Sequence, residues 1–293
     1  MNPRFPKRRS ISLLCTLALL APLLLPVLPR PATAQETIGG NGSGIVSILL
    51  VGQDRREGES TSRSDSMILC TFHKESRRLI MTSFLRDLYV QIPGFRPNRI
   101  NAAYAAGGIT LLNKTLTQNF GIHIDGNVEI DFSQFAEIID LLGGVKLSLR
   151  ADEARVISRE TGRSVSAGLQ TLDGEQALTY SRIRCLDSDG DFSRTDRQRK
   201  VISALLDAYR DLPKKEMIPL VTKLLPLIRT DMTTPQLLLC AMDILPLLSQ
   251  AQIISQRIPA EGTYTHKTVE GMSVLAADMD AARRMLRETL LGK

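Results

Sequence analysis

Gly44-Ile-Val-Ser-Ile-Leu-Leu-Val-Gly52 is a short apolar run with a glycine at each end. A run of this length and composition predicts a strand that is buried on both faces of a sheet. Further apolar segments within 66–92 predict three more strands. Over 109–212 helical patterns alternate with extended ones. The alternation predicts an α/β domain with three layers, α-β-α, and a sheet in the middle.

The elements downstream of the first strands are expected from periodicity and from helix stop signals. We expect helices at 109–119, 133–142, 174–180 and 193–212, and extended segments at 122–130 and 145–149. From Met217 onward the chain is rich in leucine and broken by proline, which predicts mostly helix. No internal linker is evident, so 44–293 is predicted to be one domain.

The first 34 residues have the features of an export leader. A basic start that includes Arg4 and Lys7 precedes an uncharged run over 11–28, and Ala32-Thr33-Ala34 matches a small-x-small cleavage site. The apolar run is also near the minimum length for a membrane span. We therefore predict a signal peptide or an N-terminal membrane anchor at 1–34, followed by a linker at 35–43.

The net charge of +6 gives little support to a nucleic-acid partner. Five of the 37 basic residues lie in the leader, which has no acids, so 32 basic residues face 31 acidic ones in the rest of the chain. A near-neutral exported domain is not expected to bind nucleic acid. The three cysteines after the leader do not predict a disulfide framework. No P-loop, zinc spacing or Gly-x-Ser-x-Gly motif occurs.

Two aspartates lie next to the first expected strands. Asp54 follows the first strand, and Asp65 precedes the second. Ligands bind at strand ends in α/β folds, and two carboxylates there can share a hard cation such as Mg²⁺ or Mn²⁺. Both residue positions also suit turns, and this plainer interpretation is the stronger one from spacing alone.

Arginines gather at other element ends. Arg86-Asp87 follows the third strand, and Arg182 and Arg184 would project to one face of an extended segment. Two adjacent guanidinium groups predict an anion between them, because arginine forks suit phosphate oxygens. A solvated edge strand is the alternative.

The expected helix over 193–212 begins with a charged turn. Ser193 and Asp196 resemble a capping box, and Arg194 and Gln198 continue the apolar stripe of the helix, so they should face inward. Inward arginine at a helix start is explained by a bound phosphate, or by pairing with Asp191 or Asp196. Aspartates and arginines at strand ends and one helix start together predict phosphoryl transfer.

These residues form a series of motifs that resembles the LytR-CpsA-Psr family of envelope phosphotransferases. The resemblance covers roughly 44–212. The motifs stand in order as Ile48-Leu-Leu-Val-Gly-Gln-Asp54, Arg63-Ser-Asp65, Arg86-Asp87, Asn98-Arg-Ile-Asn-Ala-Ala-Tyr104, Leu141-Leu-Gly-Gly-Val145, Leu172-Asp-Gly-Glu-Gln-Ala-Leu178, Tyr180-Ser-Arg-Ile-Arg184 and Gly190-Asp-Phe-Ser-Arg-Thr-Asp-Arg-Gln198.

The resemblance implies a mixed sheet, a hydrophobic pocket for a polyprenyl chain, and transfer of a glycopolymer from a polyprenyl pyrophosphate carrier to peptidoglycan at the membrane surface. It implies that Asp54 and Asp65 hold Mg²⁺ and that Asp87 is a base or orients arginine. The pyrophosphate would be bound by Arg63, Arg86, Arg182, Arg184, Arg194 and Gln198, with support from Arg197. The alternatives are a polyprenyl-pyrophosphate hydrolase and a non-catalytic regulatory or binding protein of the envelope.

The same resemblance places the protein at the extracellular face of the cytoplasmic membrane or in the cell wall. The leucine-rich segment 218–248 is a candidate wall of the lipid pocket, although ordinary core is the expected role of any one leucine there.

Overall fold

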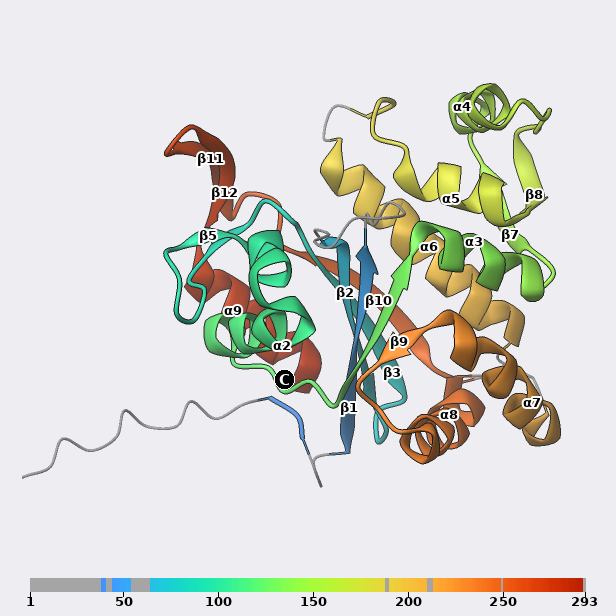
Figure 1. Ribbon diagram of the computed structural model, residues 1–293, viewed down its shortest axis with the longest axis horizontal. Helices are drawn as coiled ribbons and strands as arrows, with labels where there is room; N and C mark the ends of the chain where they lie inside the picture. The colour runs from blue at the N-terminus through green and yellow to red at the C-terminus, as the bar shows by residue number, and fades with distance from the viewer. Residues whose placement is uncertain are drawn as a thin grey trace, which may run out of the picture. The chain divides into compact units, whose positions relative to one another are not determined.

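A six-stranded mixed sheet forms the centre of the computed structural model, which describes residues 38–40, 44–53, 64–187, 190–209, 213–248 and 250–291. The strand order is β10-β3-β2-β1-β6-β9 (Figure 1). The strands are β1 (Ile45–Gln53), β2 (Ser64–His73), β3 (Arg78–Phe84), β6 (Gly126–Asp131), β9 (Arg229–Thr230) and β10 (Gln252–Ile258). Strand β1 pairs antiparallel with β2 and parallel with β6, as a mixed sheet requires.

Helices cover both faces of this sheet. On one face, α2 (Ile100–Phe120) and α9 (Met279–Leu291) pack on Leu49, Leu69 and Ile80 of the central strands. On the other face, α6 (Asp191–Tyr209) and α8 (Thr234–Leu248) pack on Ile68, Phe72 and Met81. The predicted three-layer α-β-α architecture with a central mixed sheet is therefore confirmed.

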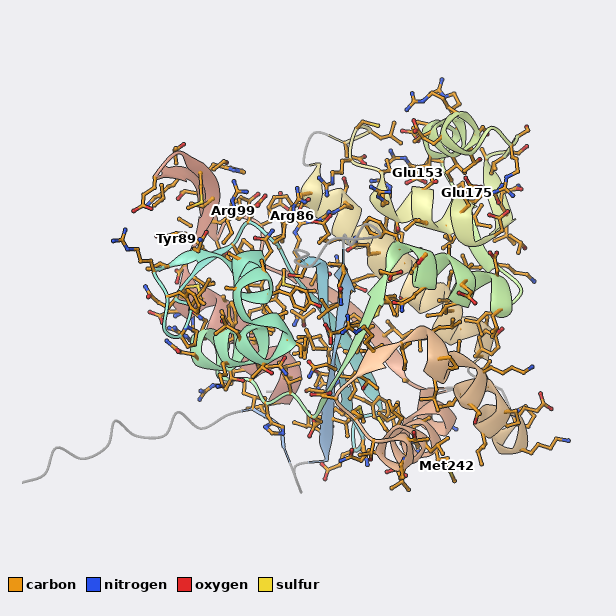
Figure 2. The ribbon with its side chains drawn as sticks, viewed as in Figure 1. Arg86, Tyr89, Arg99, Glu153, Glu175 and Met242 are labelled. Carbon is orange, nitrogen blue, oxygen red and sulfur yellow. The ribbon has the colours of Figure 1, made fainter. Side chains whose placement is uncertain are left out.

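A smaller lobe has its own core beside α6. It consists of α3 (Phe132–Leu141), β7 (Val145–Leu149), α4 (Ala151–Thr161), β8 (Gly168–Leu172) and α5 (Gly174–Arg182). Its core includes Ile139, Ile157 and Tyr180, and it carries Glu153 (Figure 2). Helix α5 approaches α3 so closely that a Cβ on Gly174 would lie 2.1 Å from the carbonyl oxygen of Ala136. Glycine at this position lets α5 reach α3 and fixes where its last residue, Arg182, lies.

The remaining elements lie at the two ends of the sheet. Strands β4 (Tyr89–Val90) and β5 (Asn98–Arg99) form one small pair, and β11 (Tyr264–Val269) and β12 (Met272–Ala277) form a hairpin. Helix α7 (Lys214–Leu224) and the short helix η2 (Leu225–Leu227) precede β9 and α8. In Figure 1 the β11–β12 hairpin and β5 lie near the end of the sheet at which β1 and β6 finish.

Several expected elements differ from those observed. The prediction of mostly helix after Met217 is wrong for 252–277, where β10 joins the central sheet beside β3 and the β11–β12 hairpin follows. The expected capping box is also wrong: α6 begins at Asp191, so Ser193 lies inside the helix and its hydroxyl donates to the carbonyl of Gly190. Arg182 ends helix α5 instead of lying in a strand.

The leader and linker predicted for 1–43 lie almost wholly outside the described residues. Among the residues that the structure does describe, none forms a helix with the length and apolar character needed to cross a bilayer.

Candidate active site

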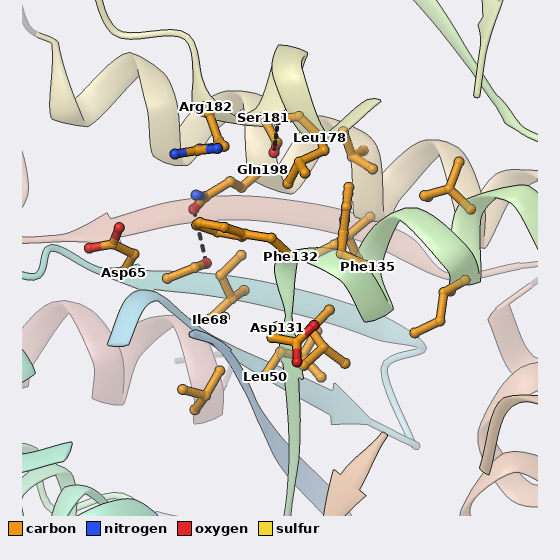
Figure 3. A pocket seen from close by; sticks show the side chains of 18 of the residues that line it. Leu50, Asp65, Ile68, Asp131, Phe132, Phe135, Leu178, Ser181, Arg182 and Gln198 are labelled. Carbon is orange, nitrogen blue, oxygen red and sulfur yellow. Dashed lines mark hydrogen bonds between the residues drawn. The ribbon is translucent and has the colours of Figure 1, made fainter. Parts of the chain in front are cut away.

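A cavity of about 550 Å³ lies between the central sheet and the helices α3, α5 and α6. The sheet contributes residues from β1, β2 and β6 near the ends of these strands. Figure 3 shows Asp65, Gln198 and Arg182 at one end of the cavity, with Phe132 beside them and Phe135 farther in. The cavity therefore has a charged end and an apolar end.

The apolar end is built from every element that surrounds it. Its walls are formed by side chains from three strands, three helices and the residue after η2, namely Leu50, Ile68, Val128, Ile130, Phe132, Phe135, Ile138, Ile139, Leu178, Val201, Ile202, Leu205 and Ile228. Most of these residues come from 50–205, and only Ile228 lies in the leucine-rich segment 218–248. The predicted hydrophobic pocket is present, but its main walls are α3 and α6.

Arg86 is the centre of the charged end. Its guanidinium group lies 2.7 Å from Oδ1 of Asp65 and 3.6 Å from Oδ1 of Asp191. The pKa of Arg86 is raised: burial alone would lower it, but the hydrogen bond to Asp65 and the charge of Asp191 outweigh burial. Its Nε is buried and has no hydrogen-bond partner among the described residues. A buried N–H of this kind is costly unless a ligand accepts from it.

Arg194, on the first turn of α6, lies beside Arg86 and faces the cavity as predicted. Its side chain is 2% exposed and donates to the backbone oxygen of Asp65 at 2.9 Å and to Asp191 at 3.1 Å. Burial, together with repulsion from Arg184 and Arg86, lowers the pKa of Arg194 to about 10 even though Asp191 opposes the shift. Its Nε is also buried without a hydrogen-bond partner in the described structure. An anion at this end could accept hydrogen bonds from the buried Nε–H groups of both Arg86 and Arg194.

Three other predicted residues reach the same cavity. The guanidinium carbon of Arg182 lies 4.4 Å from the centre of the Phe132 ring, and Nε of Arg184 lies 3.7 Å from Asp191. Gln198 accepts a hydrogen bond from Ser66 at 2.9 Å. The two arginines converge because α5 ends at Arg182, and not because they share a strand face. The structure thus assembles Arg86, Arg182, Arg184, Arg194 and Gln198 around one cavity.

Arg197 does not join this group. It is buried, and its guanidinium group lies 2.9 Å from Glu153 and 2.5 Å from Asp187. Both carboxylates neutralise it, and it is not among the described residues that line the cavity. Arg197 therefore lies outside the group of predicted residues that the structure brings together at the cavity. Arg197 instead holds residues 183–187, where it also donates to the carbonyl of Ile183, and so positions Arg184.

Asp87 lies behind Arg86, outside the lining of the cavity as described. Its carboxylate is 3.3 Å from Arg99 and 4.0 Å from Nε of Arg86. These contacts suit the predicted role of orienting arginine, and its half-buried position also leaves it reachable from solvent. Asp54 and Arg63, two other predicted site residues, lie outside the described residues.

Asp191 is a site residue for which the sequence predicted only a possible pairing with arginine. It contacts Arg86, Arg184 and Arg194 and so links three separate elements of the cavity. Its position just before the inward-facing Arg194 was the available signal. Phe132 and Ser66 gave no such signal, because a ring beside a strand end and a serine in a strand are common in any core.

A divalent cation would need carboxylate ligands at the charged end. Asp65 offers one there, beside Arg86. In the described part of the chain, no three His, Cys, Asp or Glu side chains lie together as a metal site. One or two carboxylates completed by phosphate oxygens and water are a usual ligand set for Mg²⁺, so the residues present fit a cation that is bound together with a phosphorylated ligand.

The geometry matches an amphipathic ligand. Guanidinium groups with unused N–H donors suit an anionic head, and the apolar walls suit a long hydrocarbon tail. In such a site the arginines can stabilise charge that develops on a phosphoryl group.

Two curated proteins are similar to this chain in sequence. Regulatory protein MsrR of Staphylococcus aureus (strain COL) is 37% identical over 177 residues, which is 60% of this chain and 50% of that protein. The polyisoprenyl-teichoic acid–peptidoglycan teichoic acid transferase TagT of Bacillus subtilis is 38% identical over 178 residues, 58% of this chain and 55% of that protein. The chain thus matches about half the length of these curated relatives.

Solved structures extend the similarity to most of the chain. TagT bound to LIIa-WTA superposes with a TM-score of 0.71 at 26% identity, covering 88% of this chain and 96% of that one. TagT with bound octaprenyl pyrophosphate lipid has a TM-score of 0.66 at 25% identity, covering 90% and 98%. The model of the LytR_cpsA_psr family matches residues 30–290. The chain therefore belongs to the LytR-CpsA-Psr family.

Proposed function

We propose that the protein transfers a glycopolymer from a polyprenyl pyrophosphate carrier to peptidoglycan by forming a phosphodiester bond. The observation that carries the proposal is the cavity, in which buried arginine N–H groups without hydrogen-bond partners among the described residues lie at one end and apolar walls form the rest. A polyprenyl pyrophosphate has both parts of a matching ligand. The relationship to TagT, whose name specifies teichoic acid and peptidoglycan, supports the same class of donor and acceptor.

The proposed reaction is an attack by an acceptor hydroxyl on the sugar-side phosphorus. A new oxygen–phosphorus bond forms, the bond from that phosphorus to the bridging oxygen breaks, and polyprenyl phosphate leaves with the electron pair. Arg86 and Arg194 bind the phosphate oxygens through the Nε–H groups that have no hydrogen-bond partner among the described residues, while Arg182, Arg184 and Gln198 complete the charged end. The proton of the hydroxyl passes to Asp87, which lies next to Arg86 and outside the lipid cavity.

We also propose that Asp65, together with Asp54, holds Mg²⁺ or Mn²⁺ against the pyrophosphate. The cation would neutralise charge on the phosphate oxygens. Asp65 would then contact the cation and Arg86 at once, which its two carboxylate oxygens permit. The protein would act at the extracellular face of the cytoplasmic membrane, where lipid-linked donor and peptidoglycan meet.

The test combines the purified chain with a polyprenyl-pyrophosphate-linked saccharide, Mg²⁺ and a peptidoglycan oligomer. Mass spectrometry should detect the phosphodiester-linked product, and chelation of the cation should abolish it. Arg86→Ala and Asp65→Ala should abolish it as well. Arg283→Ala is the matched control, because Arg283 pairs with Asp280 on α9, on the opposite face of the sheet.

Each other result would contradict the transfer proposal. Release of saccharide phosphate with water as acceptor, even when the oligomer is present, would identify a hydrolase. Tight donor binding with no product under any condition would identify a non-catalytic binding protein.

A further inference from the structure

A second surface of the site lies on the side of Arg86 that faces away from the lipid cavity. The β11–β12 hairpin is attached there to the loop that carries Asp87: the N–H of Leu275 donates to the backbone oxygen of Asp87 at 2.9 Å. Arg99 on β5 donates from Nε to the carbonyl of Ser273 on the hairpin at 2.9 Å, and its other end lies 3.3 Å from Asp87. Figure 2 shows Arg99 beside Arg86, on the side of the hairpin. The hairpin therefore forms a fixed part of the site.

A row of aromatic rings follows this surface outward. Phe192, the residue after Asp191, stacks on Tyr264 with ring centres 5.1 Å apart and an angle of 27°. Tyr264 in turn meets His266 edge-on, with ring centres 5.6 Å apart. Arg257 covers Phe192 at 4.6 Å from the ring centre, and Phe192 is buried. The row thus runs from the start of α6 to Tyr264, which is partly exposed, and His266, which is exposed.

The direction of attack links this surface to the acceptor. Phosphoryl transfer places the attacking and leaving oxygens roughly in line. In the proposed function the leaving group is polyprenyl phosphate, whose tail occupies the apolar cavity. The attacking hydroxyl must then approach from the opposite side of the phosphorus, away from the cavity, which is the side of Asp87 and Arg99.

We propose that Tyr264 and His266 on the hairpin, with Arg99 and Asp87, form the acceptor subsite, which binds a saccharide of peptidoglycan and presents its hydroxyl to the pyrophosphate. This inference rests on the proposed function and adds to it the location of the acceptor. Aromatic rings have electron-rich faces that attract the weakly positive C–H groups of a sugar ring. The Arg99–Asp87 pair contacts the backbone of β12 at Ser273 and Leu275, and it offers both donors and acceptors to sugar hydroxyls beside the row.

A hollow on the other side of the charged end is the competing location. It is lined by residues of α4, α5 and the following loop, including Arg159, Thr179, Arg184 and Cys185. It shares Arg182 and Arg184 with the main cavity but lies away from Asp87. An acceptor bound there would require a different direction of attack, so variants can distinguish the two locations.

The test measures binding of a peptidoglycan tetrasaccharide by saturation-transfer NMR, and its apparent KM in the transfer reaction, for the full chain with Mg²⁺. His266→Ala and Tyr264→Ala should each weaken binding and raise the acceptor KM about three- to ten-fold, the loss expected for one ring contact. Tyr264→Phe, which keeps the ring and its packing on Phe192, should bind like the unchanged chain. The Kd for octaprenyl pyrophosphate should not change in any of them.

Lys267→Ala is the matched control, because adjacent residues of a strand project to opposite faces and Lys267 lies next to His266. It should leave saccharide binding unchanged. Unchanged binding in both His266→Ala and Tyr264→Ala, or loss of binding in Arg159→Ala instead, would overturn the inference. Since NMR detects the saccharide without turnover, binding that depends on His266 in a chain that transfers nothing would disprove the transfer function and still support a saccharide site here.

Discussion

Arg194 and Arg197 lie one turn apart on α6 and are equally buried, yet their carboxylate partners differ. Arg197 meets two carboxylates, Glu153 and Asp187, and their hydrogen bonds raise its pKa although burial alone would lower it. Arg194 shares Asp191 with Arg86 and Arg184, and burial lowers its pKa to about 10. A buried arginine with matched carboxylates is costly to remove, because its partners are then left buried without a counter-charge, whereas one with too few carboxylates is prepared for an anion.

Replacing Arg194 with methionine is expected to have the largest effect. Arg194→Met should reduce transfer by about 10²- to 10³-fold, the loss typical when one stabilising donor is removed from an active site. The free energy of unfolding should stay the same or rise, because a buried, poorly neutralised charge is removed. Rates with the lipid-linked donor and denaturant unfolding would measure both quantities. A variant that unfolds more easily and keeps its rate would contradict the comparison.

Arg197→Met should show the reverse behaviour. It leaves Glu153 buried and without its charged partner, so we expect a loss of about 3 kcal/mol in unfolding free energy. Transfer per folded molecule should fall much less than in Arg194→Met, because Arg197 acts on the site only by holding residues 183–187. Urea unfolding followed by circular dichroism gives the stability. An Arg197→Met chain that is fully stable but inactive would assign Arg197 to the pyrophosphate after all.

This pair also shows what the sequence could predict. Helical spacing placed Arg194 and Gln198 inward, and the family motifs brought Arg86, Arg182 and Arg184 to the same site. Arg197 lay in the same motif, so the resemblance grouped it with the others. Its real partners are 44 residues upstream, at Glu153, and in the loop at Asp187. Sequence spacing does not show which carboxylates will face an inward arginine, because that depends on how α5 packs between α4 and α6.

The fold, like the site, could be predicted only in part from the sequence. The strands β1 to β3 and the helices α3, α5 and α6 follow from apolar runs and periodicity. Strand β10 does not, because Gln-Ile-Ile-Ser-Gln-Arg-Ile lacks clear alternation and becomes a strand through its pairing with β3. The apolar walls of the cavity were not identifiable either, since Phe135 or Ile202 would look the same in a closed core.

A smaller difference between the Arg194 and Arg197 variants is expected in how much a bound lipid pyrophosphate raises the free energy of unfolding. Octaprenyl pyrophosphate at about 100 times its Kd should raise the unfolding free energy of the unchanged chain by about 2.7 kcal/mol. Arg197→Met should keep this ligand-dependent increase, and Arg194→Met should lose most of it. Thermal unfolding with and without the lipid measures the increase. Equal stabilisation of both variants by the lipid would mean that Arg194 contributes no more to lipid binding than Arg197 does.

The smallest expected effect is on the stability of the fold at acid pH, and it arises from the ion pair between Arg197 and Asp187. The hydrogen bond from Arg197, helped by Arg150, holds the pKa of Asp187 below its ordinary value near 3.8. A carboxyl whose pKa is lower in the folded state stabilises the fold above its unfolded pKa and loses that contribution as the pH falls through its folded value. Stability of the unchanged chain should therefore fall below about pH 4 more steeply than that of Asp187→Asn.

Asp280→Asn, at an exposed site on α9, should follow the unchanged chain. Identical acid profiles for Asp187→Asn and the unchanged chain would show that Arg197 gains nothing from the charge of Asp187, and the contrast with Arg194 would then rest on Glu153 alone.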